Sequence, residues 1–262
     1  MPRALQLVSG FATAAGAGTN VVTPSPGDTF TVPSFDMSAP AWLEQTWATA
    51  TADDFVRIRS PRMHDANQGL RLMTAGQARQ PMLPYGMNQQ IYPVDTPIVE
   101  IDATGAGSDA ISVLYSWSDL PGIQARLASW SDVQPRITEV SGVDVLVSAA
   151  AAIGSYSPGV AINSAFDNFE AGSDYALLGY IMSSPALALA VIGQDTGNLK
   201  VGGPGLQAAP LTQDWFVTLS EKCGRPCIPI IAANNKGSTL VSQVDNTAHA
   251  AQHVTLIMAQ LR

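Results

Sequence analysis

Two cysteines are the first residues of this chain that could do chemistry. Cys223 and Cys227 lie in Cys-Gly-Arg-Pro-Cys, which is one residue longer than the C-x-x-C of redox and zinc sites. No second pair of ligands accompanies them in the sequence. We therefore expect one buried thiol and one thiol at a helix end. A local disulfide is the alternative, and metal binding is not expected.

The histidines and acidic residues indicate no metal site either. His249 and His253 are four residues apart, but their segment is predicted to run from a loop into a strand, where this spacing does not converge on one metal. Asp53-Asp54, Asp102 and Asp245 have the oxygen atoms that calcium prefers. For Asp102 and Asp245 we favour turns closed by bonds from nearby backbone amides.

Motifs of catalysis are missing from the sequence. It has no G-x-S-x-G, no H-E-x-x-H, no Walker A loop and no G-x-G-x-x-G. We predict that the protein is not an enzyme and takes no cofactor. An active site assembled from scattered residues is the rival hypothesis, because spatial clustering is invisible at this level.

Half of the arginines lie within one short stretch. They are Arg57, Arg59, Arg62, Arg71 and Arg79. In a strand, alternate side chains share a face, so Arg57 and Arg59 point the same way. The stripe is either a contact with acidic groups of a neighbouring subunit or a solvated face with ion pairs inside the chain. The net charge of −8 argues against direct nucleic-acid binding.

The elements that would position these residues occur twice. Residues 96–117 align without a gap on residues 239–260, which places Ile111-Ser112-Val113-Leu114 on Val254-Thr255-Leu256-Ile257. Both copies end in the alternating pattern of a β-strand. The sequence therefore predicts an internal duplication of a β-rich unit.

Earlier parts of the two copies match with gaps. Gly69-Leu70-Arg71-Leu72 resembles Asn198-Leu199-Lys200-Val201, and Asp28-Thr29-Phe30-Thr31-Val32 resembles Asp144-Val145-Leu146-Val147-Ser148. The order is kept while the spacing grows in the second copy, as loops tolerate insertions.

Composition agrees with an all-β protein of two tandem β-sandwich, jelly-roll-like domains and one or two short helices. The chain has 262 residues with 22 glycines and 18 prolines, and only 13% of its residues are charged, which suits many turns and a surface covered by partners. We expect an N-terminal arm at 1–26, a first domain at 27–118, a helical linker at 119–138 and a second domain at 139–262.

Two helices are predicted from apolar spacing. One lies between Leu120 and Trp130, and the other spans Leu211–Cys223, with Gly224 at its end. Trp215 and Phe216 form the apolar face of the second helix, to be buried by folding or by a neighbour. The candidate residues of a subunit interface are Arg57, Arg59, Arg62, Trp215 and Phe216.

The longest uncharged stretch, Tyr175–Gly193, has a membrane helix as one interpretation. Ser183-Ser184-Pro185 interrupts it, and each half has the length of a strand. We expect two buried strands joined by a turn. The N-terminus has no apolar run of signal-peptide length.

This arrangement resembles that of the double jelly-roll major capsid proteins of tailless icosahedral viruses. The resemblance extends from about Asp28 to Leu261 through the paired stretches and rests on architecture, without a diagnostic motif. It implies two eight-stranded sandwiches side by side, and three subunits in a pseudo-hexagonal capsomer.

A capsid role implies partners and a location. The chain would bind itself as a homotrimer and other virion proteins, over an internal membrane in some shells. It would be found in the virion, and in the host cytoplasm during assembly. Besides an enzyme with a scattered site, two alternatives remain: a tail or decoration protein, and a tandem carbohydrate-binding module with Trp42, Trp47 and Tyr92 as platforms.

Overall fold

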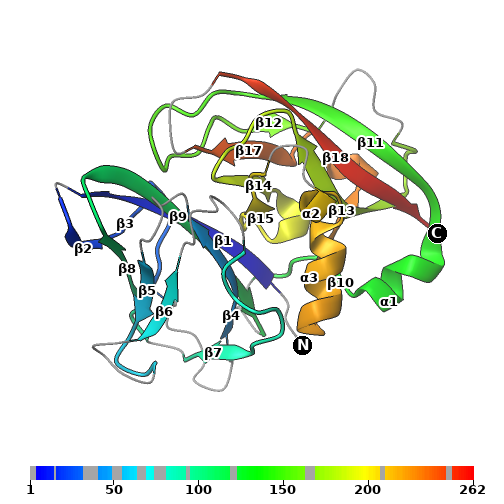
Figure 1. The fold of residues 1–262 in the computed structure, drawn as a ribbon. Coiled ribbons are helices and arrows are strands. Elements are labelled where there is room, and N and C mark those ends of the chain that lie inside the picture. Colours follow the sequence, from blue (N-terminus) through cyan, green and yellow to red (C-terminus); the bar gives the residue numbers. More distant parts are fainter. Residues whose placement is uncertain are drawn as a thin grey trace.

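A computed structural model gives the arrangement of the chain (Figure 1). The structure describes residues 4–14, 16–31, 41–48, 55–63, 69–73, 81–92, 95–118, 123–162, 169–206, 210–245 and 250–262. It is an antiparallel all-β protein with a few short helices, so the predicted fold class is confirmed.

The first domain is a sandwich of two sheets. Its strands are β1 Ala4–Ala14, β2 Gly18–Val21, β3 Thr23–Pro24, β4 Ala41–Ala48, β5 Phe55–Arg59, β6 Leu70–Met73, β7 Gln89–Ile91, β8 Ile98–Ala103 and β9 Gly107–Trp117. One sheet has the order β3-β1-β9-β4-β7 and the other β2-β8-β5-β6. Val8 and Val113 from the first sheet share a buried core with Val56 and Ile101 from the second.

The second domain repeats this plan. Its strands are β10 Leu127–Ala128, β11 Ile137–Val147, β12 Val160–Ala161, β13 Asp174–Met182, β14 Ala188–Ile192, β15 Val201–Pro204, β16 Ile228–Ala232, β17 Leu240–Val244 and β18 Gln252–Leu261. One sheet has the order β10-β16-β13-β18-β11 and the other β12-β17-β14-β15. With the short β3 and β10 set aside, β11 to β18 correspond one by one to β1, β2 and β4 to β9. Both domains have the strand order of a jelly roll.

The duplication extends to the register of the strands. β4 pairs with β9 and β13 pairs with β18 in corresponding registers, and each has a β-bulge at the corresponding position, Glu44 in one copy and Leu178 in the other. Gly69 and Asn198 also agree, with φ angles of 57° and 58° just before β6 and β15. The ungapped match of 96–117 with 239–260 therefore pairs equivalent residues.

The match of Asp28–Val32 with residues 144–148 is wrong. The described residues 28–31 form no strand, and the counterpart of β11 is β1. The N-terminal arm predicted at 1–26 is wrong for the same reason. β1 pairs with β9 along its whole length, and Leu5 and Leu7 are fully buried. The many small residues of β1 are compatible with a tightly packed strand as well as with a loose arm.

The helices agree in part with prediction. α2 Pro210–Gln213 and α3 Trp215–Cys223 fill the predicted second helix, and Gly224 ends α3 with a φ of 64°. The helix predicted from Leu120 is wrong over the described residues 123–128, which are extended and include β10. Pairing of this segment with β16 overrides its helical spacing. α1 Trp130–Val133 begins only after it, capped by Ser129, and the 3₁₀ turns are η1 Gln134–Arg136, η2 Gln194–Thr196 and η3 Ala233–Asn235.

The uncharged stretch 175–193 forms β13 and β14, joined by a turn, as predicted. Among the described residues, no helix has the length and apolar character needed to cross a membrane. Both strands are buried on nearly every residue because β13 lies under α2 and α3, while β14 is paired on both sides, with β15 and β17.

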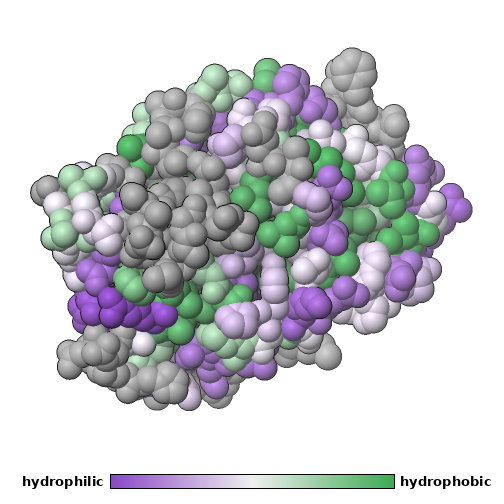
Figure 2. Space-filling view, viewed as in Figure 1, coloured by the Kyte–Doolittle hydropathy of each residue, from purple (hydrophilic) through white to green (hydrophobic). Residues whose placement is uncertain are grey.

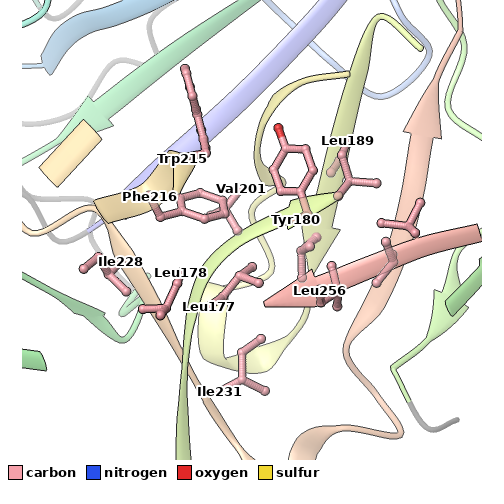
Figure 3. Packing of buried hydrophobic residues seen from close by; sticks show 14 of the residues in the cluster. Leu177, Leu178, Tyr180, Leu189, Val201, Trp215, Phe216, Ile228, Ile231 and Leu256 are labelled. Carbon is pink, nitrogen blue, oxygen red and sulfur yellow. The ribbon is translucent and has the colours of Figure 1, made fainter. Parts of the chain in front are cut away.

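The largest apolar core continues from the second domain into the first. It includes Leu5, Leu7, Trp47 and Leu114 from the sheet of β1, β9 and β4, together with residues of β14 and β15. Figure 3 shows the ring of Phe216 beside Val201, with Trp215 above it, Tyr180 to its right, and Leu177 and Leu178 below. The outer face of one jelly roll is thus covered by the other.

Candidate assembly surfaces

Trp215 and Phe216 do not lie on a subunit surface. Both are fully buried within the single chain. The ring of Trp215 lies edge-on to Trp47 of the first domain, with ring centroids 5.8 Å apart, and its Nε1 donates to the carbonyl oxygen of Gly202 at 3.1 Å. Their assignment as interface candidates is corrected, because folding of the single chain already buries them, Trp215 against Trp47 of the first domain and Phe216 against Tyr180 of the second.

A buried ion pair fastens the domains at one end. Glu44, at the bulge of β4, receives two bonds of 2.6 Å from Nε and Nη2 of Arg225, which follows α3. The Ser116 hydroxyl also donates to Glu44, while Nη1 of Arg225 donates to Asn88 at 2.6 Å. The side chains of Glu44 and Arg225 are 1% and 11% exposed, so water screens the pair little.

A second polar cluster joins the domains along β1. Nζ of Lys200 lies 2.5 Å from Oδ1 of Asp28 and 3.9 Å from the ring centre of Tyr156. The Tyr156 hydroxyl donates to Oδ2 of Asp28 at 2.8 Å, and the amide of Ser9 donates to the same oxygen at 2.9 Å. Together with the apolar core that the two domains share, these two polar clusters join the domains to each other.

The arginine stripe faces outward from the first domain. Arg57 and Arg59 on β5 both bind Glu100 on β8, at 2.7 and 2.8 Å, and these bonds, led by that of Arg59, lower the pKa of the Glu100 carboxyl. Arg71 on β6 pairs with Asp102 at 3.2 Å. Figure 2 shows a strongly hydrophilic group of atoms where Figure 1 draws β5 and β6.

Observations support both interpretations of the arginine stripe, as a subunit contact and as a solvated face with ion pairs inside the chain. The ion pairs lie within the chain, as expected of a solvated face, yet the arginine side chains keep exposed surface, 25% for Arg57 and 29% for Arg59. Arg62 follows β5 and is exposed. Arg79 lies outside the described residues. A contact through this face therefore stays a prediction.

The cysteines are two buried free thiols, so the local disulfide is absent here. Cys223 ends α3, as predicted, and both thiols lie close to the carboxylate of Glu44. Burial raises the pKa of Cys223 to about 12 and that of Cys227 well above its ordinary value.

These thiols are expected to be inert in the folded protein. At pH 8 neither should react with a maleimide within the time that labels both in urea, because the reactive species is the thiolate. Mass spectrometry of the labelled protein measures this directly. Rapid labelling of the native protein would contradict the described burial.

The acidic residues and histidines make no metal site among the described residues. Asp102 accepts from Thr19 and pairs with Arg71, while Asp245 is fully buried. His253 bonds through Nδ1 to Asp144 at 2.7 Å on the surface. His249, His64 and Asp53-Asp54 lie outside the described residues.

The aromatic residues proposed as sugar platforms do not form an open surface together. Trp47 is buried between the domains, Trp42 lies under the guanidinium of Arg225 at 5.0 Å, and only Tyr92 is exposed. An open hollow of 440 Å³ lies elsewhere, between α1 and α3, beside Trp130 and Glu221.

One surface was missed by the sequence reasoning. β11 is the outermost strand of its sheet, and its outward residues include Val140 and Leu146, each 54% exposed. Their counterparts on β1 are Leu5 and Phe11, which pack between the domains. The signal was present as alternation within residues 137–147, but only the paired structure shows which face stays open.

No protein-family model and no curated protein matches the chain. Among solved structures, it is similar to a conserved protein of unknown function from Pseudomonas aeruginosa PAO1. The two are 10% identical, the match covers 98% of this chain and 99% of that one, and the TM-score is 0.20.

Proposed function

We propose that the protein is a virion structural protein, a self-assembling capsid subunit that forms trimeric, pseudo-hexagonal capsomers. The observation that carries the proposal is the fusion of two equivalent jelly rolls into one block by a shared apolar core and two polar clusters. Jelly rolls of this strand order build many viral shells.

Duplication suits a shell for a geometrical reason. Three copies of a two-domain chain around a threefold axis present six similar domains, and six similar edges can tile a nearly hexagonal lattice. Tiling requires that the domains keep a constant relative position. The clusters at Glu44 and at Asp28 hold the two domains in one relative position, which two domains joined by a hinge would not keep.

The test is the mass of the purified protein by light scattering, followed by negative-stain imaging. Trimers of about three chain masses, or closed shells, are the expected result. A stable monomer at every salt and calcium concentration would overturn the proposal and favour a carbohydrate-binding module, which calorimetry with a panel of glycans would then test.

The arginine stripe gives this proposal a specific variant. R62E is expected to weaken assembly at least about tenfold, because it reverses a charge at the exposed end of the stripe. R57E and R59E are poor tests, since each adds a carboxylate beside the buried Glu100.

The matched control is K222E, which makes the same charge change at an exposed cation of α3 in the second domain, away from both proposed contacts. Light scattering of both variants at equal concentration compares them. Equal assembly by R62E and K222E would remove the stripe from the contact.

A further inference from the structure

The outer edge of β11 is open, whereas the corresponding edge of β1, its counterpart in the first domain, is covered. Along β1 that edge is covered by the chain itself: β3 pairs with Gly10 and Phe11, the amide of Ser25 donates to the carbonyl of Ser9, and the amide of Leu7 donates to the carbonyl of Lys200. Within the described residues, β11 has a partner strand on one side only, which is β18. It is an eleven-residue strand with an open edge, a form that commonly pairs with another chain.

The open edge strand exposes two large apolar side chains, Val140 and Leu146, among polar ones. Thr138, Glu139 and Val140 are exposed in succession, and further along Gly142, Asp144 and Leu146 are exposed while the residues between them are buried or half-buried. In Figure 1, β11 and β18 run side by side along the upper margin of the molecule. The edge carries no lysine, arginine or proline to prevent pairing.

The sequence of β11 is complementary to itself in one antiparallel register. When Val143 lies opposite Val143 of a second copy, Val140 faces Leu146 and Leu146 faces Val140. Directly opposite side chains lie on the same face of a sheet, so both apolar pairs form on the outward face. Moving the register by two residues places Val140 opposite Asp144 in one direction and opposite Ser148 in the other, and the apolar pairs are lost.

The same register places no carboxylate directly opposite another. Asp144 faces Gly142, and Glu139 faces Val147. Like charges directly opposite each other would destabilise the pairing.

We infer that β11 pairs with β11 of a second copy about a twofold axis, in the register that sets Val140 against Leu146. The two five-stranded sheets then continue into each other, and the apolar pairs lie on their common outer face. Under the proposed function, on which this role rests, the twofold contact joins neighbouring capsomers, and it is distinct from the threefold contact within one.

Cross-linking of single-cysteine variants tests the register. V140C mixed with L146C should give a covalent dimer with a short bismaleimide, because the two positions lie about 5 Å apart across the strands. Neither variant should cross-link with itself, since the like positions are separated by six residues, about 20 Å along the strand. The buried Cys223 and Cys227 give little background.

The controls separate this contact from the proposed function. V21C, at a valine of β2 that is 62% exposed, should not cross-link with either variant. Failure of the V140C and L146C mixture to cross-link, at a concentration where the protein assembles or at its solubility limit, overturns the pairing. Self-linking of V140C overturns the register and with it the proposal.

Light scattering supplies a second readout. V140K is expected to reduce shells to free capsomers, or dimers to monomers, while V21K leaves the mass unchanged. Cross-linking without threefold particles would retain the contact and reject the capsid function. Shells that form without cross-linking, or that survive V140K, would retain the function and reject the contact.

Discussion

Replacement of Trp215 by alanine is expected to lower the free energy of unfolding by about 3–5 kcal/mol. The side chain is fully buried, and it contacts Trp47 of the other domain and the backbone of Gly202. Gly203 lets β15 approach the indole so closely that a side chain at this position would collide with it. The cavity left by W215A therefore opens at the junction of the domains, where neither sandwich can close it alone.

Urea denaturation followed by circular dichroism measures this loss. Tyr92→Ala is the control, because that aromatic side chain is 44% exposed and its loss should change stability by less than about 1 kcal/mol. A loss of stability for W215A no greater than that for Y92A would show that the junction is not packed as described.

Replacement of Glu44 by glutamine is expected to cost about 3 kcal/mol or more. The substitution keeps the shape of the side chain but leaves the guanidinium of Arg225 buried without its carboxylate. It also removes the charge that accepts from Ser116. We expect this loss of stability to weaken mainly the contact between the two domains, since the pair joins β4 of the first domain to the segment after α3 in the second.

A double-mutant cycle of E44L, R225M and E44L/R225M isolates the pair. The double variant E44L/R225M should recover much of the stability, because a buried pair replaced by apolar groups leaves no uncompensated charge. R71A removes an exposed pair with Asp102 and should cost less than about 1 kcal/mol. Similar losses for E44Q and R71A would show that the Glu44 pair is solvated.

Some features of this fold were predictable because their signals are local. The alternating pattern at the ends of residues 96–117 and 239–260 identified β9 and β18 and their equivalence between the copies. The glycine after Cys223 marked the end of α3. Patterns of this kind depend only on residues that are close together in the sequence, so they can be recognised without the structure.

The candidate surfaces were less predictable because they depend on distant contacts. The sequence does not show whether Trp215 is buried by folding or in a subunit interface. Only its contact with Trp47 in the structure shows that the chain itself covers it. Small residues in β1 suggested a loose arm, yet β9, which lies about a hundred residues later, makes it a central strand.

The sequence by itself determined the all-β class and the duplication that makes β9 equivalent to β18, since side-chain alternation and turn residues act over a few positions. The tertiary structure decided which of two equivalent faces is covered. Leu5 and Phe11 of β1 pack between the domains, whereas Val140 and Leu146 of β11 remain exposed. The physical reason is that a chain of two domains has one junction, which can bury the face of only one of its two equivalent sheets.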